Sequence, residues 1–557
     1  MKAINKLYIT ILLTCSILLG CTDQFEEFKG DNDSLTSDDI SARFFFPNVQ
    51  TRMWMPPSWS YLFTRIMIGS AYGGYASFGY KNSWEQPDVV FNTTRSWGAS
   101  ADAWNHWSGY FLHIDGFLRL VEPGGQLENH LMEAVGNIMK ANYYFMYSEQ
   151  FGEIPYSEVG EGILEPKFDE QITIYEGVIN DLDDAMAVIG DETVTGLGAS
   201  DLAEYDILFN GDLQKWKAFA NGIKLRIALR ANGAPGETFA DAAITEALAN
   251  PLPTEDVKIV KDLEVSWSVA ARDGDFTRFA GSWKMLSAKL INTLQDNDDP
   301  RLPMFADPID GGELVFGGYD ETANKEKIDY LLENTLDRAG VPYFTTMEGG
   351  DLIVTIEEGP DYYVGQPMRF VDGMKTFLHT EMFSRPNRLT EGVLDIGDEI
   401  DQYIMPMSEI YLMQAEAAVL GFGGDANALY QQAIQASFDQ WEVEDNGYLA
   451  SPIATLSGTT EEQLQQIGLQ AWLALYFVDY QGWAVARDFH LDYITDDTPD
   501  LPTIFSNSIP LGRSFPNRVK YAQPAYDLNG SNLSVAISRQ GEDTPATELW
   551  FTMGSKY

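Results

Sequence analysis

The chain has 557 residues, with 36 Lys and Arg against 83 Asp and Glu, and its formal net charge is −47 at pH 7. A hydrophobic fraction of 45% and an aromatic fraction of 13% exclude a disordered chain, because such chains have too few apolar residues to form a core. Nucleic-acid binding depends on Lys and Arg that displace counterions from phosphates, so the charge argues against DNA and RNA as partners and leaves neutral or cationic ligands open.

Residues 1–20 have the layout of an export signal. Two lysines precede an apolar run from Leu7 to Leu19, and Cys21 follows directly after Gly20. This run of about 13 residues is shorter than the ~20 that a membrane-spanning helix needs. The sequence Leu18-Leu19-Gly20-Cys21 is similar to a bacterial lipobox, so we expect cleavage before Cys21 and acylation of that cysteine. The alternative is an ordinary secretory signal with an incidental cysteine.

The two cysteines limit the chemistry of the mature chain. Cys15 leaves with the signal and Cys21 receives lipid, so no thiol remains for a disulfide, a nucleophile or a metal site. Residues 21–40 are acidic and suit a flexible tether between the membrane and the folded protein. No linker composition divides residues 41–557, for which we expect one α-rich binding domain.

Helical spacing of apolar residues predicts most of the elements in this domain. In chain order, the predicted helices are 104–121, 131–150, 173–189, 213–230, 240–249, 283–294, 408–420, 426–441 and 460–477. The helix at 213–230 also carries five cations, which we expect to pair with carboxylates; a site for phosphate or an acidic ligand is the alternative.

The helices at 408–420 and 426–441 predict a hairpin. Glycines between Gly421 and Gly424 end the first helix, and the side chain of Asp425 can cap the second. Length and alanine spacing resemble a tetratricopeptide unit, although the full repeat signature is absent. By contrast, residues 263–279 and 302–385 lack helical period and predict long loops with short strands, a type of segment that is usually functional.

Aromatic residues are concentrated between Trp54 and Trp107, and these include six of the thirteen tryptophans. Flat rings beside amide and carboxylate groups complement the apolar faces and hydroxyl rims of sugars, so some of these rings predict a glycan site. Trp104 and Trp107 have helical spacing and predict core positions instead. The candidate ligand-binding residues are Tyr72, Tyr75, Tyr80, Trp84, Trp97, Trp283 and Tyr319. Their candidate hydrogen-bonding neighbours are Asn82, Glu85 and Asp88.

The sequence contains no pattern typical of an enzyme. The five histidines lack the spacing of a zinc site, and no nucleophile elbow or phosphate-binding loop is present. A pair of carboxylates for glycoside hydrolysis could be chosen from many, but sequence does not give their separation. Residues 296–299 are rich in Asp, yet they lack the spacing of a calcium loop and predict a helix end and turn. We therefore expect no metal and no cofactor.

Several segments in order resemble the SusD/RagB-like family of outer-membrane lipoproteins, especially its second sequence group. The matching segments are 141–157, 166–175, 210–230, 299–303, 407–417 and 515–518. Among them are Asp212-Leu213-x-Lys215-Trp216 and Asp299-Pro300-Arg301, which we expect to form caps, turns and ion pairs. Residues 471–475 fit the family pattern, but the stretch from Tyr476 to Tyr480 matches it only loosely.

The resemblance implies a mainly α fold, in which tetratricopeptide-like helix pairs form a scaffold with long loop-rich insertions and a few short strands. It also implies a non-catalytic protein that is lipid-anchored at the cell surface, in the outer membrane. There it would capture a neutral glycan for a SusC-like TonB-dependent transporter and act as its lid. Some relatives take peptide, so a peptide-binding protein of the same type stays an alternative, and a surface glycosidase is a further one.

Overall fold

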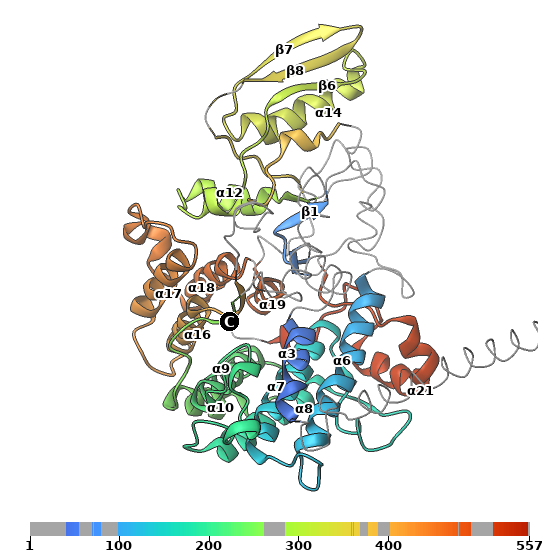
Figure 1. Cartoon of the computed structure of the whole chain (residues 1–557). Coiled ribbons are helices and arrows are strands. Elements are labelled where there is room, and N and C mark those ends of the chain that lie inside the picture. The colour runs from blue at the N-terminus through green and yellow to red at the C-terminus, as the bar shows by residue number, and fades with distance from the viewer. Residues whose placement is uncertain are drawn as a thin grey trace, which may run out of the picture.

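The structure is a computed structural model in which helices predominate (Figure 1). It describes residues 41–54, 69–70, 72–78, 99–260, 284–357, 359, 361–367, 377–387, 401–476, 478, 480–491 and 516–554. Within these residues, a helical body surrounds the larger hydrophobic core, and a smaller layer of strands at one end of the molecule encloses a second.

The first half of the helical body is a series of helices, each of which packs against the next one in sequence. These helices are α3 (Phe46–Trp54), α6 (Ala99–Val121), α7 (His130–Phe151), α8 (Gln171–Ile189), α9 (Leu213–Ala231) and α10 (Ala240–Ala249). Side-chain caps set two of their starts: Asn129 accepts hydrogen bonds from the second and third amides of α7, and Asp212 does so at α9. The helices predicted in this half are confirmed, including the core positions of Trp104 and Trp107.

The second half contains the predicted helix hairpin. The helices of the second half are α16 (Met407–Val419), α17 (Ala426–Gln440), α18 (Thr460–Ala474), α19 (Gln481–Asp488) and α21 (Gln523–Gln540), and the hairpin consists of α16 and α17. Gly421 has φ 96°, a conformation that favours glycine, and it lies two residues after Val419, the last residue of α16. The Asp425 carboxylate accepts a hydrogen bond from Ala428 N at 3.0 Å, as a cap of α17. The hairpin prediction is therefore confirmed.

Four of the five cations of α9 pair with carboxylates, as expected from the charge balance, and Lys217 donates to the Gly190 carbonyl. Lys224 Nζ lies 2.6 Å from Asp183 and 2.8 Å from Glu246. Arg226 donates two hydrogen bonds to the Glu409 carboxylate, at 2.8 and 2.7 Å. These pairs join α9 to α8, α10 and α16, and they leave these two cations engaged within the fold.

The region 284–357 differs in part from the predicted loops and helix. The expected helix at 283–294 is instead β5 (Lys284–Leu286) followed by α12 (Ala288–Asp296), because the Ser287 hydroxyl caps Leu290 N at 3.0 Å. The short α13 (Leu302–Phe305) follows. An unpredicted helix, α14 (Thr322–Leu332), is mostly polar in its N-terminal half, so it shows little amphipathic period over its length.

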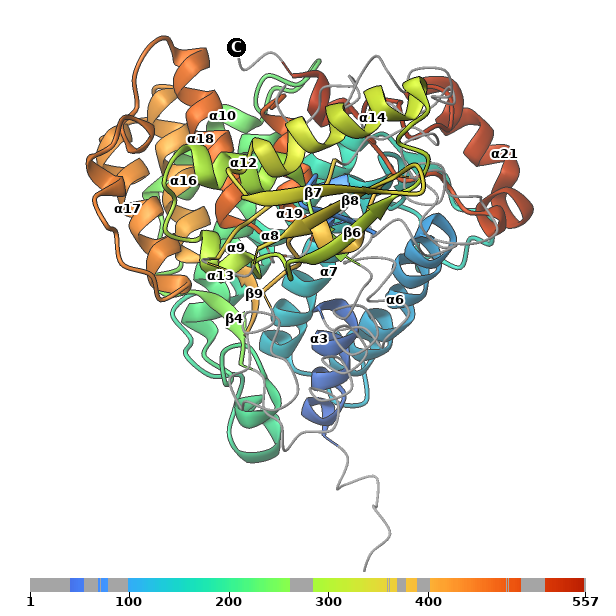
Figure 2. The same cartoon turned by 90° about the horizontal axis from the view of Figure 1, so that it is seen from above.

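Helix α14 packs on a three-stranded antiparallel sheet with the order β6-β8-β7 (Figures 1 and 2). The strands are β6 (Gly312–Phe316), β7 (Tyr343–Glu348) and β8 (Asp351–Ile356). Leu314, Phe316 and Val354 face the helix and form the second hydrophobic core with Ile328 and Leu331. Figure 1 shows this layer at the end of the molecule away from α10.

Three strand pairs complete the fold. They are β1 (Ala76–Phe78) with β5, β2 (Ile154–Pro155) with β3 (Phe168–Asp169), and β4 (Val257–Ile259) with β9 (Gln402–Met405). Strand β5 lies where the two cores meet: Met285 belongs to the second core and Leu286 to the larger one. Among the described helices, none is long and apolar enough to span a membrane.

Candidate functional site

The strand pair β1–β5 brings together the ends of two candidate ligand-binding segments. The strands are antiparallel, and Phe78 is directly paired with Lys284. Tyr80 follows Phe78 by two residues, and Trp283 directly precedes Lys284 in the chain. Two segments that are about 200 residues apart in sequence are therefore attached to adjacent strand ends. Their candidate residues Tyr80, Trp84, Trp97 and Trp283 lie outside the described residues, as do Cys21, Asn82, Glu85 and Asp88.

Tyr72 and Tyr75 do not lie on a ligand surface, and the structure contradicts the prediction for them. Tyr75 is 3% exposed and stacks on Trp472 with ring centroids 4.8 Å apart and planes 9° from parallel. Tyr72 is 2% exposed and meets the ring of Trp483 edge-on at 5.3 Å. The alternation of rings with small residues lets this segment pack closely against α18 and α19.

Trp472 also holds the β1 segment through two hydrogen bonds. The Tyr75 hydroxyl donates to the Trp472 carbonyl at 2.5 Å, and Trp472 Nε1 donates to the Gly73 carbonyl at 2.7 Å. Burial raises the pKa of the Tyr75 phenol well above its usual value, which keeps the hydroxyl a donor. Ser287 N donates to the Tyr75 carbonyl at 2.8 Å, which ties the same segment to the start of α12.

Gly482 is the residue that permits this packing on the α19 side. A Cβ atom at this position would lie 1.8 Å from the Tyr75 hydroxyl oxygen, which is far too close for two atoms that are not bonded to each other. Sequence reasoning missed Trp472, Trp483 and Gly482 as supports of the β1 segment. The sequence held no local signal for these contacts, because Trp472 lies 397 residues from Tyr75.

Tyr319 is half-buried in the connection between β6 and α14, and its polar and aromatic groups are already engaged. Its hydroxyl donates to the Asp329 carboxylate at 2.6 Å. The Lys325 ammonium lies 4.4 Å from the ring centroid, over the aromatic face. This ring therefore has one contact with an exposed cation, and a ligand would have to compete with that contact or use another part of the ring.

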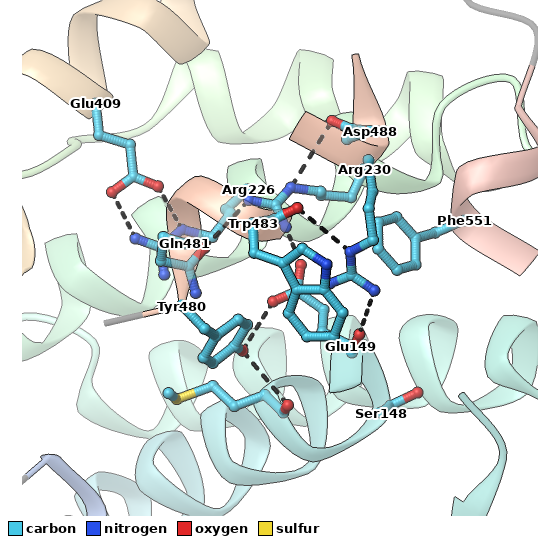
Figure 3. A network of polar contacts seen from close by, with 12 residues as sticks. Ser148, Glu149, Arg226, Arg230, Glu409, Tyr480, Gln481, Trp483, Asp488 and Phe551 are labelled. Atoms are coloured by element: carbon cyan, nitrogen blue, oxygen red, sulfur yellow. Dashed lines mark hydrogen bonds and ion pairs between the residues drawn. The ribbon is translucent and has the colours of Figure 1, made fainter. Parts of the chain in front are cut away.

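A buried network of charged residues lies among α7, α9, α16 and α19 (Figure 3). Arg230 forms an ion pair with Glu149 and has its Nε 3.7 Å from Asp488. Tyr480 donates to Glu149 at 2.8 Å. Burial alone would lower the pKa of Arg230, but the carboxylates of Glu149 and Asp488 raise it above the ordinary arginine value. Arg230 is consequently a permanent cation.

Arg487 connects this network to the C-terminal segments. Its guanidinium lies 3.6 Å from the ring centroid of Trp483 and donates to the Glu149 carbonyl at 2.9 Å and the Asn517 carbonyl at 2.7 Å. Burial lowers the pKa of Arg487 to about 9. A cavity of about 30 Å³ among Arg226, Arg230 and neighbouring side chains has room for about one water molecule, so the network suits a structural role and not the capture of a ligand.

A larger cavity of about 260 Å³ opens between the start of α8 and α21. Both cations that line it are already paired, Lys167 with Asp169 at 3.3 Å and Arg539 with Glu153 at 2.6 Å. The candidate rings that the structure describes, Tyr72, Tyr75 and Tyr319, do not line this cavity.

The carboxylates buried in the core have structural partners. Arg301 pairs with Asp299 at 2.7 Å, which confirms the ion pair expected from Asp299-Pro300-Arg301. The acidic stretch before it is a helix end and turn, with Asp296 as the last residue of α12. Within the described ranges, no group of three or more His, Cys, Asp or Glu residues could hold a metal ion. Carboxylates paired with arginine in this way fix the packing of helices and are poor proton donors.

Comparison with known proteins gives a consistent result. Residues 55–340 and 357–521 match the model of a SusD-like family described as starch-binding and associating with the outer membrane. No curated protein matches the sequence.

Many solved structures share the fold. A SusD homologue from Bacteroides uniformis has a TM-score of 0.68 at 18% identity, covering 92% of this chain and 100% of that one. A SusD-like protein from Bacteroides thetaiotaomicron has a TM-score of 0.67 at 19% identity, with 92% and 98% covered. A chitin-binding SusD homologue from Flavobacterium johnsoniae has a TM-score of 0.65 at 18% identity, with 93% and 100% covered.

At these identities the similarity to solved structures concerns the fold, whereas the family model matches most of the sequence itself. The predicted mainly helical fold is therefore confirmed as a SusD-like fold. The chain belongs to the SusD-like family of starch-binding proteins that associate with the outer membrane.

Proposed function

We propose that the protein is a cell-surface lipoprotein that captures an oligosaccharide or polysaccharide and delivers it to a SusC-like TonB-dependent transporter. The family description, starch-binding, supports the ligand class. The observation that carries the proposal for the site is the pairing of Phe78 with Lys284, because it joins the segments that bear Tyr80 and Trp283 at adjacent strand ends. Several rings from two segments could then face one sugar chain.

The proposed ligand is a neutral glycan. The net charge of −47 disfavours acidic polysaccharides, and aromatic rings bind the apolar faces of neutral sugars. Some structurally similar proteins are chitin-binding, and the family description names starch. Titration calorimetry with chito-oligosaccharides, malto-oligosaccharides and a panel of other neutral glycans tests this proposal. Absence of binding to every glycan, together with binding to peptides, would favour the peptide-binding alternative.

The substitution test for the site uses the rings that lie next to the strand pair in sequence. Trp84→Ala and Trp283→Ala should each weaken binding of the glycan found in the panel, with unchanged thermal unfolding. Phe344→Ala is the control, because Phe344 is a 62% exposed ring on β7, apart from the strand pair. Unchanged affinity in both tryptophan variants would contradict this placement of the site.

The proposed mechanism is capture under a hinged lid. The ligand is held between this protein and the outer face of the transporter, and closure of the lid commits it to passage inward. Acylation of Cys21 keeps the protein at the membrane, and mass spectrometry of the mature N-terminus tests that step. Purification of the transporter complex with and without glycan tests the lid. A complex whose opening and affinity do not respond to ligand would refute it.

A surface glycosidase is the remaining alternative. Incubation of the purified protein with the bound oligosaccharide distinguishes it, because hydrolysis products would refute a purely binding function. The expected result is recovery of the intact oligosaccharide.

A further inference from the structure

Exposed apolar side chains gather where the described body begins. Phe44 ends the short helix η1 (Ala42–Phe44), Phe45 follows it, and they are 43% and 46% exposed. Leu197, at 90% exposed, directly precedes the short helix η3 (Gly198–Ser200), which packs against η1. We call Phe44, Phe45 and Leu197 the N-terminal patch. Large apolar side chains that are exposed together mark an interaction surface more often than singly exposed ones do.

The patch is built by specific contacts between segments about 155 residues apart. Arg43 Nη1 donates to the Gly198 carbonyl at 3.0 Å, and the Ser41 hydroxyl donates to the Ala199 carbonyl. The ring of Phe44 meets the ring of Tyr205 edge-on at 5.1 Å, and the Arg43 guanidinium lies 4.8 Å from the centroid of the Tyr205 ring. These contacts hold η1 against the segment of η3 and position the Phe44 ring, which stays 43% exposed.

We propose that the N-terminal patch contacts the lipid surface of the outer membrane and seats the body against it. This inference rests on the proposed acylation of Cys21, which lies 20 residues before Ser41. Even a fully extended chain of 20 residues spans at most about 70 Å. The tether therefore begins in the membrane and ends beside the patch. A tethered surface acts at an effective concentration in the millimolar range, so a contact of a few apolar side chains is sufficient.

The chemistry of the contact is apolar. With a net charge of −47 the protein is repelled by anionic headgroups, and Asp201 and Glu204 lie in the same segment as the patch. Attachment through phosphates is therefore unfavourable, and insertion of Phe44, Phe45 and Leu197 into the interface is the favourable term. A contact of this kind should resist added salt, which weakens electrostatic adsorption.

The test uses the protein from Thr22 onward, which contains no cysteine and carries an N-terminal histidine tag in place of the lipid. The tag tethers it to phosphatidylcholine vesicles that contain a nickel-chelating lipid. Single-cysteine variants F45C and L197C receive an environment-sensitive fluorophore, and F344C is the matched control on an exposed phenylalanine of β7. A quencher attached to lipid acyl chains reports which positions reach the interface.

We expect several-fold stronger quenching at positions 45 and 197 than at position 344. This difference in quenching should persist at high salt. The double substitution F44S/L197S should reduce quenching of a label at position 45 to the level of the control. Equal quenching at all three positions would overturn the proposal. Shielding of position 45 only when the transporter is added would overturn it as well, because the partner of the patch would then be a protein. Glycan affinity, measured on the same preparations, tests the proposed function separately, and the tag makes the result independent of acylation.

Discussion

Substitution of Tyr75 by phenylalanine removes one oxygen atom from the support of the β1 segment. That oxygen donates to the carbonyl of Trp472 in the last turn of α18, where helical carbonyls lack partners within the helix. The neighbouring carbonyls of Ala471 and Leu473 accept from Leu475 N and Tyr476 N. In the variant the Trp472 carbonyl would be buried without this donor.

The expected loss follows from these contacts. Leaving a buried acceptor unsatisfied costs about 1–3 kcal/mol, whereas the stacking of ring 75 on Trp472 is kept. We therefore expect Tyr75→Phe to lower the free energy of unfolding by about 1–3 kcal/mol. Since each 1.4 kcal/mol is tenfold in an equilibrium constant, hydrogen exchange of the amides in 72–78 should become about 5- to 150-fold faster.

Urea denaturation followed by tryptophan fluorescence measures the global change, and exchange followed by mass spectrometry measures the local one. Tyr319→Phe is the matched control, because its hydroxyl bonds an exposed carboxylate and its loss should change stability by less than about 0.5 kcal/mol. Equal stability of the Tyr75 and Tyr319 variants would refute the argument that the hydroxyl of Tyr75 is a buried structural donor. If the Tyr75 variant bound glycan more weakly at unchanged stability, the prediction that Tyr75 contacts the ligand would be supported instead.

Three further predictions concern buried charges. Glu409→Gln leaves the guanidinium of Arg226 buried without its carboxylate, so the free energy of unfolding should fall by about 3–5 kcal/mol in urea denaturation, and a loss below about 1 kcal/mol would contradict it. Asp206→Asn places an amide N–H donor beside groups that already donate, including Trp216 Nε1 at 2.7 Å. Calorimetry should show that the free energy of unfolding falls by about 1–3 kcal/mol, and an unchanged Tm would count against this. Burial raises the pKa of the carboxyl groups of Asp206 and Glu153, so in the window above the ordinary carboxyl pKa the folded protein holds protons that the unfolded chain releases. Stability should consequently be higher near about pH 5 than near about pH 8, and a Tm that rises with pH would contradict the sign.

The elements that sequence predicted well are those with local signals. The hairpin of α16 and α17 has apolar residues at helical spacing, a glycine with positive φ at its turn and a capping aspartate, and all three signals lie within a few residues of the feature they specify. The pairing of the α9 cations with carboxylates followed from charge balance. Their actual partners did not, because Glu409 lies 183 residues from Arg226.

The candidate site was predicted less well, and the reason is the distance in sequence between contacting residues. Tyr75 is separated from Trp472 by 397 residues, so nothing near Tyr75 indicates that its ring is covered. Rings alternating with glycine and alanine suit an exposed loop and a closely packed segment equally well. Helix α14 was missed for a different reason: its buried apolar residues Ile328, Leu331 and Leu332 all lie in its C-terminal half.

The position of β5 explains why a site at the strand pair would have a firm base. Adjacent residues of this strand enter different cores, Met285 the second and Leu286 the larger one, because successive side chains of a strand point to opposite faces. Strand β1 is held to the larger core by Tyr75 and to the start of α12 by the bond from Ser287 N. These bonds fix β1 and the start of α12 to the larger core, and Met285 joins β5 to the second one. The segments after Phe78 and before Lys284 are therefore attached at a junction that both cores stabilise. A rigid attachment of this kind is what precise presentation of rings to a ligand requires.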